Sequence, residues 1–136
     1  MVGRVIRFDH VTKSYPTSSR PALDDVTLDI PDGEFVFLIG ASGSGKSTFL
    51  ELLIREENVS AGDIYFDDFH VNTLTGKQVN KLRQSIGYVF QDFRLLVNKT
   101  VYENVAFTIR EHTDLPEELV RDLVLMKLHA VGLRGA

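Results

Sequence analysis

The sequence predicts an α/β fold built around a phosphate-binding loop, and three adjoining features support this prediction. Residues 35–39 are an apolar run typical of a buried strand, residues 40–48 are rich in glycine, and residues 49–55 have the spacing of an amphipathic helix. A strand, a glycine-rich loop and a helix in this order let successive backbone N–H groups surround a phosphate. We therefore expect a nucleotide to bind at this loop.

The loop consists of Gly40, Ala41, Ser42, Gly43, Ser44, Gly45, Lys46, Ser47 and Thr48. Its glycines allow positive φ angles and a close approach of the backbone to an anion. Lys46 is expected to reach the β- and γ-phosphate oxygens, the Ser47 hydroxyl to ligate Mg²⁺, and Thr48 to donate to the α-phosphate. A glycine- and serine-rich surface turn could match this spacing by accident, but the flanking strand and helix favour the phosphate loop.

Composition limits the remaining possibilities. The 136 residues form one domain or part of one, and 43% hydrophobic with 25% charged residues is an ordinary globular mixture. Because the net charge is −4, electrostatics gives no reason to expect binding to nucleic acid or to an anionic membrane surface. The sequence has no cysteine, no apolar run long enough to cross a membrane and no signal-peptide core, so membrane association is expected only through a partner.

The first half of the chain predicts strands around the loop. Residues 5–11 have the pattern of a half-buried strand, and residues 13–21 form a polar loop. Residues 26–30 alternate as a second strand, which is predicted to turn at Pro-Asp-Gly and pair as a hairpin with a central buried strand at 34–39. The helix that starts at Lys46 is predicted to end near Asn58.

The second half predicts more helix. Residues 64–68 resemble a strand that ends in a magnesium-binding carboxylate, but the run is short and close to the phosphate loop, so we favour a peripheral hairpin. Helices are predicted at 75–84, 100–110 and 114–131, with a further strand at 86–90. For the last helix we expect Asp114 as N-cap, Pro116 in the first turn, Gly132 at the end, and an apolar stripe of Leu119, Leu123, Met126 and Val131.

The segment around Gln91 carries a family resemblance. The string LRQSIGYVFQDFRLL at 82–96, followed by KTVYENV at 99–105, resembles the Q-loop region of ATP-binding cassette ATPases, and in particular the FtsE family of bacterial cell division, of the actinobacterial type. The similarity runs from Ile6 to about Leu133. It implies a P-loop NTPase fold, the nucleotide-binding domain of the cassette, with its core at 3–91 and the start of a helical subdomain at 92–136.

The resemblance also implies roles for individual residues. Tyr15 would stack on adenine, residues 40–48 would hold the phosphates of ATP, and Gln91 would reach Mg²⁺ and the attacking water. Lys46 and Gln91 would then be the catalytic groups, and Ser47 and Gln91 the metal ligands. The implied assembly is a homodimer that sandwiches ATP and drives an FtsX-type integral membrane protein from the cytoplasmic face of the plasma membrane.

The sequence departs from the family after Gln91. Members continue with a Ser-Gly-Gly signature, a strand that ends in Asp-Glu and a switch histidine, and none of these follows here. We expect a truncated sequence, the N-terminal part of one ATPase domain over 1–136, which cannot hydrolyse ATP alone because those groups are absent. The histidines, which we expect to be solvated or half-buried, are His10, His70, His112 and His129.

Several alternatives have to be weighed. A small GTPase and a small-molecule kinase are disfavoured because their downstream motifs are missing. Two alternatives stay open: an exporter-type cassette, such as those of lipoprotein release or macrolide efflux, and a non-catalytic remnant. The segment 92–96 favours the division type. Its side chains Phe93, Leu95 and Leu96 could form a groove for a short helix of the membrane partner, or could instead pack beneath the helix that starts near Thr100.

Overall fold

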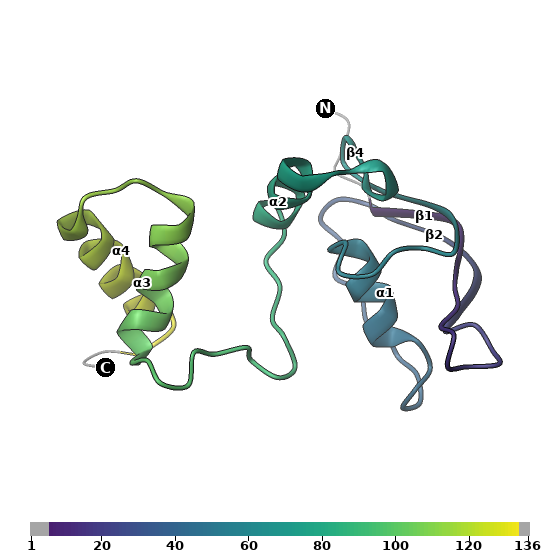
Figure 1. The fold of residues 1–136 in the computed structure, drawn as a ribbon, viewed down its shortest axis with the longest axis horizontal. Helices are drawn as coiled ribbons and strands as arrows, with labels where there is room; N and C mark the ends of the chain where they lie inside the picture. Colours follow the sequence, from purple (N-terminus) through teal and green to yellow (C-terminus); the bar gives the residue numbers. More distant parts are fainter. Residues whose placement is uncertain (1–5, 134–136) are drawn as a thin grey trace. The chain divides into compact units, whose positions relative to one another are not determined.

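The structure is a computed structural model that describes residues 6–133, and its chain divides after Tyr88 into two compact units (Figure 1). The first unit ends at Tyr88 and the second starts at Val89. This division lies close to the boundary predicted after Gln91, and the identity of the second unit as a helical subdomain stays a prediction. Within residues 6–133, no helix is both long and apolar enough to cross a membrane.

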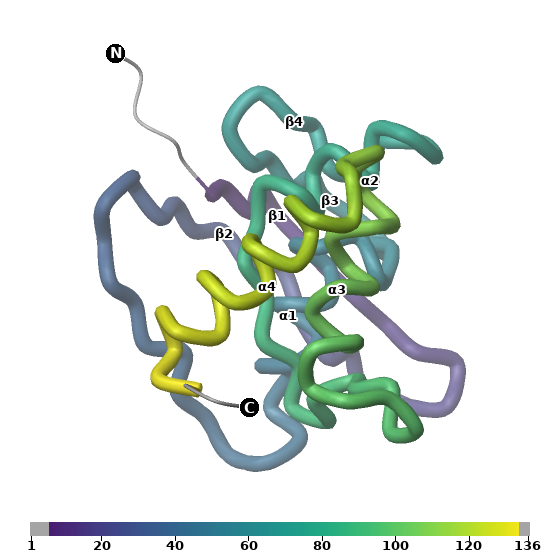
Figure 2. The backbone as a smooth tube through the Cα atoms, turned by 90° about the vertical axis from the view of Figure 1, so that its left-hand side faces the viewer, coloured from purple at the N-terminus to yellow at the C-terminus, as the bar shows by residue number. Residues whose placement is uncertain are grey.

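The first unit contains a four-stranded sheet with strand order β2-β1-β3-β4. Its strands are β1 (Ile6–Lys13), β2 (Leu23–Ile30), β3 (Ala61–Phe66) and β4 (Phe69–His70). All three pairings are antiparallel, and the backbone course of the strands can be followed in Figure 2. Apolar and polar residues alternate along β1 and β2, so that one face of the sheet is available for packing.

Helix α1 (Lys46–Leu53) packs on the apolar face of this sheet. The ring of Phe8 on β1 stacks on that of Phe49 on α1, with centroids 4.2 Å apart. Leu52 and Ile64 are almost fully buried in the same cluster. Burial of each large apolar side chain stabilises the fold by about 1.5–3 kcal/mol, so this core fixes α1, and the loop before it, against the sheet.

The first unit ends with η1 (Val71–Thr73) and α2 (Gly76–Gln84). The backbone N–H of Thr75 donates to Oε1 of Gln78 at 3.2 Å, which fixes the start of α2. Leu82 is fully buried and attaches this helix to the core of the first unit.

The second unit is a pair of helices, α3 (Val101–His112) and α4 (Glu117–Ala130). Its core consists of Ala106, Val120, Val124 and Leu128. Arg110 donates to both carboxylate oxygens of Glu117, at 2.8 and 2.6 Å, and this bidentate pair closes the turn between the helices.

Several elements match their predictions. The strands predicted at 5–11 and 26–30 are β1 and β2, although Val5 lies outside the described residues. The helices predicted at 75–84 and 100–110 are α2 and α3. The hairpin predicted around residues 64–68 is formed by β3 and β4, but it is not peripheral, because β3 pairs with β1 and Ile64 is fully buried.

The predicted strands at 34–39 and 86–90 are wrong as elements of this structure. Both segments are outside every strand of the described chain, and β2 pairs with β1 instead of forming a hairpin with 34–39. The side chains of Phe35, Phe37 and Ile39 are 85%, 76% and 88% exposed. An apolar segment becomes a buried strand only when neighbours pair with its backbone and cover both faces, and no segment of residues 6–133 does so here.

Two helix boundaries also differ from the predictions. Helix α1 ends at Leu53, because Ile54 leaves the helical geometry and Arg55 has a φ of 58°. Helix α4 begins at Glu117, with Pro116 rather than Asp114 in the N-cap position, and Gly132 follows its end with a φ of 82° as expected. The predicted stripe is wrong, since the buried face is Val120, Val124 and Leu128 and not Leu119, Leu123, Met126 and Val131.

Candidate nucleotide-binding site

The glycine-rich loop connects residues 34–39 to α1 and takes a conformation that needs its glycines. Gly43 and Gly45 have φ angles of 78° and 91°, and the N–H of Ser44 donates to the carbonyl of Ala41 at 3.1 Å. A Cβ atom at Gly45 would lie 2.2 Å from the carbonyl oxygen of Ala22, so no larger residue fits there. The loop therefore packs at Gly45 against Ala22, just before β2, and its residues 40–44 are exposed to solvent.

The N-terminus of α1 is open to an anion. Its N-cap residue, Gly45, has no side chain to accept from the first N–H groups, and the first turn contains no acidic residue. By contrast, Thr100 caps α3 with help from Glu103 in its first turn. The unpaired N–H groups and the positive end of the helix dipole of α1 therefore remain available to a phosphate.

Lys46 places its charge over the loop. Its Nζ donates to the carbonyl oxygens of Gly40 and Ala41, both at 2.7 Å, and to Oγ of Ser44 at 3.2 Å. These contacts hold the ammonium group beside the open helix end, which gives this end of the first unit a local positive charge in a chain whose net charge is −4. Ser47 follows directly and is exposed, so its hydroxyl is accessible to a metal ion.

Tyr15 lies next to the phosphate loop, although it is far from it in sequence. Its hydroxyl is 3.4 Å from Oγ1 of Thr48, whose residue is only 8% exposed. The structure thus brings Tyr15, predicted to contact the base, next to Thr48, predicted to contact a phosphate. The hydroxyl of Thr48 points to Tyr15 here, and its contact with an α-phosphate stays a prediction.

Gln91 belongs to the second unit, where it is exposed in a turn. The chain beyond it is tightly folded, since Phe93 and Arg94 have φ angles of 58° and 44° and the guanidinium of Arg94 lies 3.9 Å from the ring centroid of Phe90. The roles predicted for Gln91 toward Mg²⁺ and water remain predictions.

The second unit has an apolar groove of about 620 Å³ beside this turn. Phe93, Leu95 and Leu96 line it together with residues of α3 and α4, and Phe93 and Leu95 are 72% and 63% exposed. The alternative that these side chains pack inward beneath α3 therefore does not hold. Asn104 on α3 fixes the rim, because its side chain bonds the N–H and carbonyl of Leu96 at 2.8 and 3.2 Å.

His10, His70 and His112 make local side-chain contacts away from the loop, and His129 is exposed on α4. His10 and Asp25 are joined at 2.7 Å, and the hydrogen bond and negative charge of Asp25 raise the pKa of His10. His70 bonds Asp63, and His112 bonds the carbonyl of Thr108. All are exposed or half-buried, as predicted.

Two neighbours of the site were missed by sequence reasoning. Ala22 supplies the carbonyl that restricts Gly45, and Lys13 lies against Tyr15. A backbone carbonyl gives no sequence signal, and a lysine in a polar segment is normally a solvated residue. Only the position of Lys13 two residues before Tyr15 could have indicated a shared site.

An open helix end behind a glycine loop, a lysine over that loop and an adjoining aromatic ring define the site of a P-loop nucleotide-binding protein. The model of the family described as "ABC transporter" matches residues 23–134. The chain therefore belongs to the ABC transporter family, with the fold of its ATP-binding cassette.

Relatives agree with this assignment. The chain is 54% identical over 134 residues to the cell division ATP-binding protein FtsE of Mycobacterium tuberculosis, covering 96% of this chain and 56% of that protein. It is 39% identical over 123 residues to the intermembrane phospholipid transport system ATP-binding protein MlaF of Haemophilus influenzae, covering 90% of this chain and 47% of that protein. The chain thus spans about half the length of these relatives, and the predicted resemblance to FtsE-type cassettes is confirmed.

A solved structure shows the same fold. The ATP-binding cassette MJ0796, described as a dimer in a post-hydrolysis state bound to ADP and Pi, superposes with a TM-score of 0.81 at 34% identity. The match covers 91% of this chain and 56% of that chain, which confirms the predicted P-loop NTPase fold.

Proposed function

We propose that this chain supplies the ATP-binding part of a cassette ATPase that acts with a membrane partner in bacterial cell division. The observation that carries this proposal is the open N-terminus of α1 behind Gly45, with Lys46 on one side and Tyr15 close by. This arrangement fits a nucleotide, because it offers an anion site and an aromatic surface in the same unit.

Each residue has a separate task in the proposed reaction, phosphoryl transfer to water. The N–H groups of the loop hold the β-phosphate, and the ammonium of Lys46 stabilises charge on the β- and γ-oxygens. Ser47 would hold Mg²⁺, which would neutralise phosphate charge, and Gln91 would orient the attacking water. The chain spans about half the length of the relatives it matches, so we propose ATP binding for the loop described here and hydrolysis as an activity of the whole protein.

The relatives support the proposed setting. FtsE is a cell-division protein, MlaF is the ATP-binding protein of a transport system, and MJ0796 was solved as a dimer with ADP and Pi. We accordingly propose a homodimer on the cytoplasmic face of the plasma membrane with an FtsX-type partner. A transport cassette of the MlaF kind is the second candidate, because 39% identity over 90% of the chain also relates this sequence to that system.

The decisive experiment replaces the loop lysine in the intact protein. Lys46→Ala removes a charge-assisted contact to the phosphates, so the affinity for Mg-ATP measured by calorimetry should fall at least about tenfold, and hydrolysis should be lost. Lys77→Ala, at an exposed position on α2, is the matched control and should leave both unchanged. Equal Mg-ATP affinity in the wild type and Lys46→Ala would contradict the proposed site.

The partner is tested at the groove of the second unit. Phe93 is 72% exposed and lines the groove, where a partner helix would bury it. Phe93→Ala should therefore weaken binding of the purified FtsX-type protein in detergent about tenfold, because it removes an aromatic anchor of the interface. Mg-ATP affinity should stay within about threefold of the wild type. Leu119→Ala, 48% exposed on α4 and outside the groove, is the control. A loss of ATP affinity with partner binding intact would count against the groove as the docking surface.

A further inference from the structure

The last residue of β1, Lys13, is buried although it carries a charge. Only 8% of it is exposed, and its Nζ donates to Oε2 of Glu57 at 2.7 Å and to the carbonyl oxygen of Asn58 at 2.8 Å. The same ammonium lies 4.7 Å from the centroid of the Tyr15 ring. Lys13 thus connects the chain after α1 to the ring that adjoins the phosphate loop.

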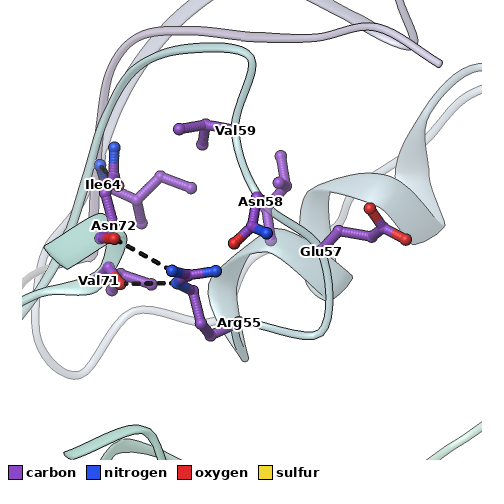
Figure 3. A pocket seen from close by; sticks show the side chains of 8 residues that line it. Arg55, Glu57, Asn58, Val59, Ile64, Val71 and Asn72 are labelled. Carbon is purple, nitrogen blue, oxygen red and sulfur yellow. Dashed lines mark hydrogen bonds between the residues drawn. The ribbon is translucent and has the colours of Figure 1, made fainter. Parts of the chain in front are cut away.

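The segment that holds Glu57 is itself anchored. Arg55 donates from Nε to the carbonyl of Val71 at 3.1 Å and from Nη2 to that of Asn72 at 3.2 Å. Figure 3 shows these two bonds, with Glu57 further along the same segment, on the wall of a small cavity of about 270 Å³. Because Arg55 ties the chain after α1 to η1, the carboxylate of Glu57 is a fixed partner for Lys13.

A role in stability alone does not account for the lysine. Burial of an ammonium group is unfavourable unless it is paired, and a buried ion pair often stabilises a fold no better than an apolar pair of the same size. What an apolar side chain could not provide at this position is a cation over an aromatic ring. The backbone at this position closes the loop that carries Tyr15, since the N–H of Ala22 donates to the carbonyl oxygen of Lys13 at 2.7 Å.

We propose that Lys13 is a positioning residue for adenine recognition, which it serves by holding the ring of Tyr15 in place for the base. The ammonium lies over one face of the ring, and the phenol hydroxyl contacts Thr48 at the far end, so in this proposal the base stacks on the opposite face. A ring fixed in advance loses less conformational freedom when the base binds. This inference rests on the proposed function, in which Tyr15 stacks on the base of ATP.

A double-mutant cycle in the intact protein tests the inference. Mg-ATP affinity is measured by calorimetry for the wild type, Lys13→Met, Tyr15→Ala and the double variant, with Mg-tripolyphosphate as a ligand that has no base. Lys13→Met should weaken Mg-ATP binding about threefold to tenfold and leave Mg-tripolyphosphate binding within about twofold. In the Tyr15→Ala background, Lys13→Met should have no further effect on Mg-ATP, because the ring on which the lysine acts is gone.

The outcomes separate this inference from the proposed function. If the wild type binds neither ligand, the proposed function itself fails. If the wild type binds Mg-ATP but Lys13→Met weakens both ligands equally, or weakens Mg-ATP equally with and without Tyr15, Lys13 is a structural residue and the inference is overturned. Thermal unfolding without nucleotide checks that the variants fold. If Lys13→Met does not fold, Glu57→Gln replaces it in the cycle, since it neutralises the fixed partner of Lys13 and should give a smaller loss of Mg-ATP affinity that again requires Tyr15.

Discussion

Helices α1 and α3 begin in opposite ways. At α3, Oγ1 of Thr100 accepts from the N–H of Glu103 at 3.1 Å, and Glu103 in turn accepts from the N–H of Thr100 at 2.8 Å. At α1, the N-cap is Gly45 in the left-handed region, with no side-chain acceptor and no acid in the first turn. The first turn of α3 thus has side-chain partners for its backbone N–H groups, whereas the first N–H groups of α1 have no such partner and are available to a ligand.

The capped start of α3 contributes to stability, whereas the uncapped start of α1 serves binding. A capping box stabilises a helix by satisfying N–H groups that would otherwise need water or another partner. The same groups at α1 lie at the end of the glycine-rich loop, where the N-cap has no side chain and the ammonium of Lys46 is close by. The missing cap at α1 is therefore a property of the site, and substitutions at the two helix ends should affect different measurements.

The largest effect is expected from Gly45→Ala in the intact protein. The new Cβ would combine a φ of 91° with a 2.2 Å approach to the carbonyl of Ala22, so unfolding should be easier by about 2–4 kcal/mol and Mg-ATP binding should be lost. The matched control is Gly43→Ala, where φ is 78° but no atom lies within 4 Å, and there only about 1–2 kcal/mol of backbone strain is expected. Chemical denaturation and calorimetry measure both quantities. If the two variants were equally stable, the contact with Ala22 would not be what restricts the loop.

An intermediate effect is expected at the start of α3. Thr100→Ala removes the hydroxyl that accepts from Glu103, so the free energy of unfolding should fall by about 1 kcal/mol while Mg-ATP affinity stays the same. Thr100→Ser keeps the hydroxyl and should retain most of the stability. A change in Mg-ATP affinity on Thr100→Ala would remove the distinction between the two helix ends.

The smallest effect is a pH dependence. The hydrogen bonds from the N–H and the side chain of Thr100 lower the pKa of Glu103 below its ordinary value of 4.5. Stabilisation by Glu103 is therefore fully present above that value and is lost as the pH falls through the lowered pKa. The difference in Tm between wild type and Glu103→Gln should shrink as the pH falls through the lowered pKa of Glu103, and should be smaller at pH 7 than that caused by Thr100→Ala. A difference that grew in acid would mean that the carboxylate is not the stabilising form.

The candidate site could be predicted from the sequence to the extent that its chemistry lies in one segment. The residues from Gly40 to Thr48 carry their own spacing signal, and the structure gives them the expected loop and helix end. The contact of Tyr15 with Thr48 joins positions far apart in the chain. The contact of Tyr15 with Lys13 joins near neighbours, but no recognisable sequence motif predicts it. Such contacts depend on how β1 and α1 pack together, which no local pattern reports.

The fold could be predicted where one face of an element is clearly apolar. The sequence predicted strands β1 and β2 and helices α2 and α3 correctly. It did not predict the pairing of β2 with β1, because a turn at Gly33 does not decide which strand pairs with β2. On α4, Leu119 and Val120 lie on adjoining faces, 48% and 0% exposed, and both faces are apolar enough to be buried. Packing against α3 buries the face that carries Val120, and this depends on tertiary contacts rather than on the local sequence.

The exposed run at 34–39 has a consequence for the handling of residues 1–136 by themselves. Phe35, Phe37 and Ile39 alternate with Val36 and Leu38, which are 48% and 46% exposed, so apolar side chains project from both sides of an unpaired backbone. A segment of this kind, without proline or charge between residues 35 and 39, has the composition of an aggregation-prone peptide and can pair with the same segment of another copy. A preparation of these residues should therefore lose monomer in a concentration-dependent way, and a charge at Phe37, as in Phe37→Lys, should slow that loss more than one at the exposed Val89 of the second unit.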